Sequence, residues 1–171
     1  KEKMGTDMIK KREDELNEKL FETLESIQNL KILAPNHKKR LSIFSFYVEN
    51  THFNLVVKLL NDRYGIQTRG GCSCAGTYGH FLLNIDQETS NKIKDQILEG
   101  CSTEKPGWIR LSLHPTIKDT EVDFICNSLV ELCENIHEWS SDYSYNTIKN
   151  DYVHKSVKPI ENVLVNKWFQ M

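Results

Sequence analysis

The chain concentrates reactive side chains in one glycine-rich stretch, residues 64–80, where two thiols, an arginine and a histidine lie among five glycines. Gly70-Gly71 permits positive φ angles, so the residues after it are expected to form a surface loop. Arg69 lies just upstream of both thiols, and a nearby positive charge favours the thiolate form of a cysteine. The stretch therefore predicts a nucleophilic or redox-active thiol at Cys74 or Cys72.

Each of these residues also has a plainer interpretation. Cys74 is otherwise an incidental small loop residue, and Cys72 is either a second, resolving thiol or a bystander. The Cys-x-Cys pair with His80 could ligate zinc, but a fourth ligand at ordinary spacing is missing, so no metal is expected. His80 and His114 either line a cleft or are structural. The remaining cysteines are expected to be inert: Cys101, Cys126 and Cys133.

A second stretch of interest, residues 106–116, is expected to contain a strand from Trp108 to Leu113. Pro-Gly precedes this strand and a proline follows it, which suits strand ends. Alternation places Arg110 on the same face as Trp108 and Ser112. That face points either to a substrate or to solvent.

The apolar pattern predicts a chain in which helices and strands alternate. Thr6 is expected to cap the first helix, Gly65 to end the second in the left-handed conformation, and the run 41–48 to be a strand covered on both faces. The expected helices span 6–27, 50 or 51–63, 85–99 and 116–138, and the expected strands span 30–33, 41–48, 66–69 and 108–113. This order favours an α+β fold, or layered α/β: a small mixed sheet of three to four strands with helices packed on one side. Residues 139–171 are expected to form a tail packed over this domain.

The composition excludes several classes of function. The 171 residues suffice for one domain, and 22 basic against 24 acidic residues leave a net charge of −2, with no field that attracts nucleic acid or anionic membranes. No apolar run approaches the roughly 18 residues of a membrane helix, and the start lacks a signal peptide, so a cytoplasmic protein is expected. Five cysteines without a Cys-x-x-Cys pair indicate reduced thiols. The initial lysine indicates a piece of a longer polypeptide.

The two stretches, residues 64–80 and 106–116, together resemble a known family. Arg69-Gly-Gly-Cys-Ser-Cys-Ala75, then Trp108-Ile-Arg-Leu-Ser-Leu-His-Pro-Thr116 and a helix with Asp119 and Glu121, are similar to the C-terminal small domain of class V aminotransferases. The similarity covers about residues 7–138 and is greatest to cysteine desulfurases and selenocysteine lyases. It implies a fold-type-I enzyme whose large domain binds pyridoxal 5′-phosphate while this small domain closes over it.

The resemblance also implies roles for individual residues. The family's mobile-loop cysteine falls on Cys74 and its substrate-carboxylate arginine on Arg110, whose planar guanidinium offers two parallel donors to a carboxylate. Arg69 would either hold the loop or contact the cofactor phosphate across the domain gap, and is otherwise a surface arginine at a strand end. His80 would line the cleft that holds the cofactor. The family's cofactor lysine follows a histidine, but the one His-Lys pair here, His37-Lys38, lies in a basic turn and does not match that motif.

The chain is therefore expected to be a fragment that is inactive alone, with residues 1–29 as a linking helix from a missing large domain and 30–138 as the small domain. The leading hypothesis is a cysteine desulfurase or selenocysteine lyase, with cysteine or selenocysteine as substrate and a sulfur-acceptor protein as a further partner. An aminotransferase or lyase without sulfur transfer, favoured by the long insertion 84–107, and a freestanding thiol carrier or metal module remain alternatives. The parent is expected to be a homodimer and the fragment a monomer.

Overall fold

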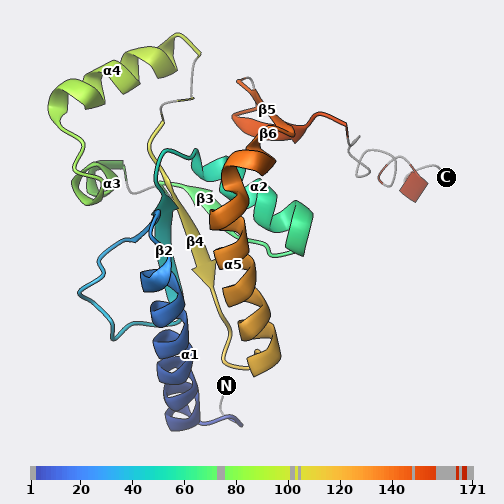
Figure 1. Cartoon of the computed structure of the whole chain (residues 1–171). Coiled ribbons are helices and arrows are strands. Elements are labelled where there is room, and N and C mark those ends of the chain that lie inside the picture. The colour runs from blue at the N-terminus through green and yellow to red at the C-terminus, as the bar shows by residue number, and fades with distance from the viewer. Residues whose placement is uncertain are drawn as a thin grey trace.

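A computed structural model describes residues 3–72, 76–100, 103, 105–147, 149–156, 165, 167 and 168. Helices and strands are interspersed along the chain before a final pair of strands (Figure 1). The elements are α1 (Thr6–Ser26), β1 (Leu30–Ile32), β2 (Ile43–Val48), α2 (Phe53–Tyr64), β3 (Arg69–Gly71), α3 (Gly76–Leu82), α4 (Gln87–Leu98), β4 (Trp108–Ser112), α5 (Asp119–Ser140), β5 (Tyr143–Asn146) and β6 (Asp151–His154).

The main sheet has four strands in the order β1-β2-β4-β3. Strand β4 lies between β2 and β3 and runs antiparallel to both, with Ile109 opposite Phe46 on one side and Gly70 on the other. Strand β1 is also antiparallel to its neighbour β2. The α+β class is confirmed, but the sheet is antiparallel throughout rather than mixed. The reason is that β4 inserts between the two strands that α2 connects, which would otherwise pair in parallel.

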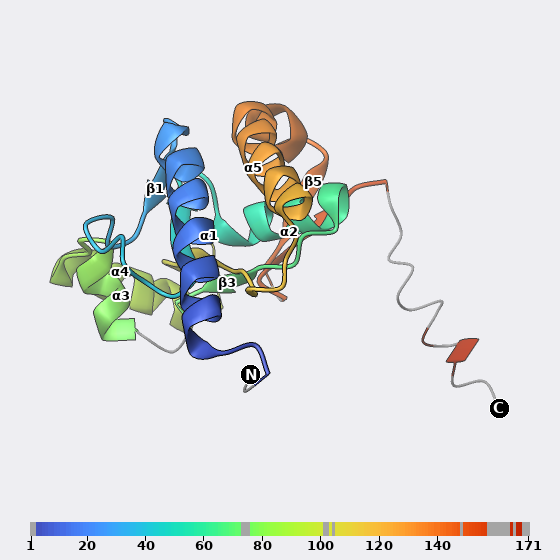
Figure 2. The same cartoon turned by 90° about the horizontal axis from the view of Figure 1, so that it is seen from below.

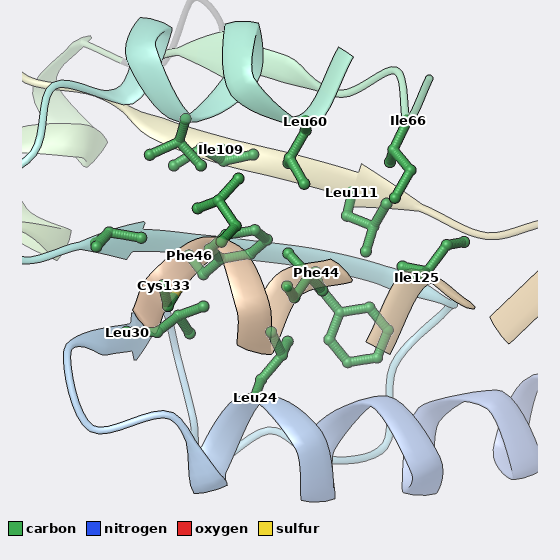
Figure 3. Close-up of a cluster of buried hydrophobic side chains, with 14 of the residues drawn as sticks. Leu24, Leu30, Phe44, Phe46, Leu60, Ile66, Ile109, Leu111, Ile125 and Cys133 are labelled. Atoms are coloured by element: carbon green, nitrogen blue, oxygen red, sulfur yellow. The ribbon is translucent and has the colours of Figure 1, made fainter. Parts of the chain in front are cut away.

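The inner face of the sheet carries the hydrophobic core (Figure 3). Phe44 and Phe46 of β2 and Ile109 of β4 have no exposed surface. They pack against buried side chains of α1, α2 and α5, among them Leu20, Leu24, Val56, Leu60 and Leu129. Full burial of such a side chain contributes about 1.5–3 kcal/mol, so this layer supplies most of the favourable free energy of folding.

The helices do not all lie on the inner face. Helices α1 and α5 lie next to each other, whereas α3 and α4 are set apart from them (Figure 2). A Cβ atom on Gly79 of α3 would lie 3.0 Å from the ring of Trp108, whose side chain points to the outer face. Helix α3 was not expected as a separate element, and it covers one end of the face that was predicted to lack helices.

Two strand predictions need correction. Strand β2 is covered on one face only, because Ile43, Ser45 and Tyr47 are exposed or half-buried while the alternate residues are buried. Strand β3 begins at Arg69 rather than ending there. A Cβ atom on Gly70 would lie 2.8 Å from the Phe53 ring, so pairing with β4 at this point requires glycine.

Helix boundaries differ in detail from the predictions. Gly5, not Thr6, caps α1, and α2 begins later than expected because the side chain of His52 caps it by accepting a hydrogen bond from the Asn54 N–H. Gly65 ends α2 with a φ of 68°, as predicted. In α4, Ile93 is buried as expected, but Ile97 is 40% exposed because the helix extends away from the core.

Residues 143–154, which follow α5, contain the β5–β6 hairpin, which the sequence did not predict. The hairpin packs against α2, where the Tyr143 hydroxyl donates to Asp62 at 3.1 Å and the Asn54 side-chain amide donates to the Asn150 carbonyl.

At the other end of the chain, Leu16, Leu20 and Leu24 of α1 belong to the core. None of the described helices combines the length and apolar character needed to cross a membrane.

Candidate functional site

The outer face of the sheet brings the two predicted arginines together. Arg69 of β3 lies directly opposite Arg110 of β4, and Ser45 of β2 lies opposite Arg110 on its other side. Directly opposed residues in an antiparallel pair point to the same face, with Cβ atoms about 4.5–5.5 Å apart. Arg110 shares this face with Trp108 and Ser112, as the alternation predicted.

The arginine pair has no neutralising partner in the described part of the chain. No carboxylate there lies within ion-pair distance of either guanidinium, although eight other ion pairs are present. The Nε atom of Arg110 is buried without a hydrogen-bond acceptor. A buried donor without a partner costs about 1–3 kcal/mol, and directly opposed like charges repel. These features fit a site that is completed by an anionic ligand.

The base of the thiol loop lies at one end of the same face. Strand β3 ends at Gly71 and α3 begins at Gly76, so only residues 72–75 connect them. A Cβ atom on Gly79 would lie 3.6 Å from the Cβ atom of Cys72 as well as against Trp108, so the first residue of the loop lies beside α3. Cys72 is a free, half-buried thiol. Cys74, the predicted nucleophile, lies outside the described residues.

The histidines near the two motifs have structural partners. The Nδ1 atom of His80 lies 3.3 Å from the Ser90 hydroxyl, which connects α3 to α4. The His114 ring lies 2.7 Å from the Thr116 hydroxyl in the turn before α5. The predicted contact of His80 with the cofactor stays a prediction.

The other described cysteines lie in the core. Cys126 and Cys133 are buried on α5, and burial, with a smaller contribution from Glu134, raises the pKa of Cys133 to about 12. Both match the prediction of inert thiols. Within the described residues, no three His, Cys, Asp or Glu side chains are grouped closely enough to hold a metal ion.

Sequence reasoning missed the residues that support the loop from the inner face. The Phe53 ring fills the space left by two glycines, because Cβ atoms on Gly70 and Gly107 would lie 2.8 and 2.5 Å from it. His52 stacks on Phe53 with ring centroids 4.4 Å apart, and burial lowers the pKa of His52. The available signal was a glycine next to each of two predicted strands, Gly70 after 66–69 and Gly107 before 108–113. Such glycines leave space that a large side chain can fill.

Comparison with known proteins places this geometry in a family. The family model for class V aminotransferases matches residues 1–125. The chain belongs to the class V aminotransferase family. A search of curated proteins found no match. The family assignment agrees with the resemblance carried by the two sequence motifs around Cys72 and Arg110.

A solved structure with a similar fold is the apo structure of a cysteine desulfurase from Thermococcus onnurineus NA1. The TM-score is 0.54 at 24% identity, and the match covers 78% of this chain and 28% of the desulfurase. The chain therefore spans less than a third of the length of that protein. At this identity the match shows the fold, which is the predicted class of a fold-type-I enzyme domain.

Proposed function

We propose that this chain is the substrate-facing C-terminal domain of a pyridoxal-phosphate-dependent cysteine desulfurase or selenocysteine lyase. The observation that carries the proposal is the unneutralised Arg69–Arg110 pair beside the base of a cysteine-containing loop. Membership of the class V family supports the general kind of chemistry. A longer parent protein would supply the cofactor lysine.

The described residues fit the anionic groups of such a complex but not its lysine attachment. Arg110 would hold the substrate carboxylate through two parallel N–H donors, and Arg69 would hold a second anionic group such as the cofactor phosphate. Lys38, in the one His-Lys pair, lies 2.7 Å from the Glu25 carboxylate and over the Phe21 ring at 5.5 Å. Lys38 lies in the loop between β1 and β2, whereas Arg69 and Arg110 lie on β3 and β4.

The thiol step is a displacement at sulfur. The Cys74 thiolate attacks the sulfur of the substrate cysteine, the carbon–sulfur bond breaks, and the substrate carbon takes up a proton to leave as alanine. The sulfur stays on Cys74 as a persulfide, so atoms and electrons balance without an added oxidant. Pyridoxal phosphate, when bound, supplies the electron sink that makes the carbon–sulfur bond labile.

A class V aminotransferase or lyase without sulfur transfer is the second candidate. The short connection favours it, because only residues 72–75 link β3 to α3, and Gly79 of α3 lies close to Cys72. A connection of four residues favours chemistry in which no loop thiol has to reach the substrate. Arg110 would keep the same role in this enzyme.

Sulfur mapping separates the two candidates. In the cofactor-loaded parent incubated with cysteine, we expect a persulfide on Cys74, loss of desulfuration in Cys74→Ser and retention of most activity in Cys72→Ser. The Cys72→Ser variant is the matched control, since it removes a thiol two residues away. A persulfide on Cys72 would overturn the assignment of the nucleophile. If both variants keep full turnover of the amino-acid substrate and neither cysteine carries a persulfide, the aminotransferase or lyase is favoured.

A further inference from the structure

We infer that the C-terminal β5–β6 hairpin positions the base of the thiol loop through His52, Phe53 and Asn54 at the start of α2. The hairpin lies beyond residue 125, where the match to the family model ends. The biological meaning of the inference rests on the proposed function of the loop. Its structural content is tested on the chain itself, without cofactor or substrate.

The first link joins the hairpin to His52. The rings of Tyr145 in β5 and Tyr152 in β6 lie 5.4 and 5.6 Å from the His52 ring, and 5.2 Å from each other. These three rings pack together where the hairpin meets the first turn of α2. A side chain on each hairpin strand therefore fixes the imidazole.

The second link joins His52 to Phe53. The two rings are stacked at 4.4 Å with an interplanar angle of 26°, and the His52 Nδ1 atom accepts the Asn54 N–H at 3.1 Å. Stacking and capping together leave the imidazole little freedom to rotate. Displacing His52 would remove one wall of the Phe53 site.

The third link joins Phe53 to the strand that leads into the loop. Cβ atoms on Gly70 and Gly107 would lie 2.8 and 2.5 Å from the Phe53 ring, so the ring packs directly on glycine backbone. Packing this close transmits a displacement of the ring to its neighbours. The strand residues that would move are Gly70 and Gly71, immediately before Cys72.

Asn54 provides a second connection that does not depend on stacked rings. Its side-chain amide donates to the Asn150 carbonyl in the hairpin turn, and its Oδ1 atom would lie 3.0 Å from a Cβ atom on Gly70. One side chain thus contacts the hairpin and β3 together. The far end of the loop is held separately, by the contact of Gly79 with Trp108.

The test measures amide hydrogen exchange at Gly70, Gly71 and Cys72, with peptide-resolved alkylation of the Cys72 thiol by iodoacetamide. In the full chain we expect Tyr152→Ala to speed both about tenfold through local opening. Tyr152→Phe retains the ring and should restore wild-type rates. Val130→Ala is the destabilised control, since Val130 packs on the core beside Ile27 and Asn29, and it should leave both rates unchanged.

Equal rates in Tyr152→Ala and wild type would overturn the inference, and so would equal acceleration by Tyr152→Ala and Val130→Ala. If Tyr152→Ala does not fold, Asn54→Ala takes its place, because it breaks the second connection while keeping every ring. Unchanged rates in Asn54→Ala would then overturn the inference. Alkylation needs no sulfur transfer, so loss of the persulfide result would leave this outcome standing and mark the proposed function alone as wrong.

Discussion

The two faces of the four-stranded sheet differ in what their side chains do. On the inner face, Phe44, Phe46 and Ile109 are completely buried against three helices. On the outer face, Arg69 and Arg110 lie side by side without a neutralising partner among the described residues. Strand β4 contributes to both faces, so a period of two along five residues puts core residues on one face and Arg110 on the other.

The difference shows how a small domain can hold an unfavourable charge arrangement. Repulsion between the opposed guanidinium groups is unfavourable, whereas burial of the apolar layer beneath them is favourable. A residue changed on one face should therefore affect the free energy of unfolding, and a residue changed on the other should affect ligand binding.

The largest expected effect is on the inner face. Phe46→Ala should lower the free energy of unfolding by about 3–5 kcal/mol, because it leaves a cavity in the centre of the core. Ser45→Ala, the neighbouring residue on the outer face, should change it by less than about 0.5 kcal/mol. Urea titration followed by circular dichroism measures both values. Similar losses in the two variants would contradict the division between faces.

Thiol reactivity should follow the same division. Iodoacetamide at pH 8 should modify half-buried Cys72 at least about 100-fold faster than Cys133, because burial raises the pKa of Cys133 to about 12 and blocks access. Cys126 should behave like Cys133. Mass spectrometry of native protein gives the three rates, and unfolded protein in urea is the control in which the rates converge. Rapid native modification of Cys133 would show that the core opens readily.

The smallest expected effect is a pH dependence at His52, where the inner layer meets the hairpin. Burial lowers the pKa of His52 below its ordinary value of 6.5, so the unfolded chain binds the proton more readily than the folded one. The resulting loss of stability is absent well above pH 6.5 and grows as the pH falls through that value. His52→Asn keeps a helix-capping side chain and should show a shallower decline between about pH 7.5 and 5. Identical declines would remove His52 as the cause.

The sequence predicted the elements whose patterns are long or strongly punctuated. The α1 and α5 stripes, the cap at Gly65 and the strand from Trp108 were identified because each depends on local sequence. The register that places Arg69 opposite Arg110 depends on long-range pairing, which a single sequence does not encode locally.

Other misses have similar causes. The short helix α3 has few apolar residues facing the domain, and it is held by the contact between Gly79 and Trp108. The β5–β6 hairpin depends on packing against His52 and Asn54, nearly a hundred residues earlier. The candidate site was thus predicted as a set of residues, while its geometry and its support from the hairpin came only from the tertiary structure.

The most direct test is Arg110→Lys in the longer parent protein proposed above, assayed for both activity and stability. If Arg110 grips the substrate carboxylate, loss of one arm of the guanidinium should cost about 2–3 kcal/mol of transition-state binding, which lowers kcat/KM for cysteine about 100-fold. The free energy of unfolding should change by less than about 0.5 kcal/mol. Ser112→Ala, two residues along the same face, should leave both quantities unchanged. Unaltered kcat/KM in Arg110→Lys would contradict the assignment of the outer face as the substrate site.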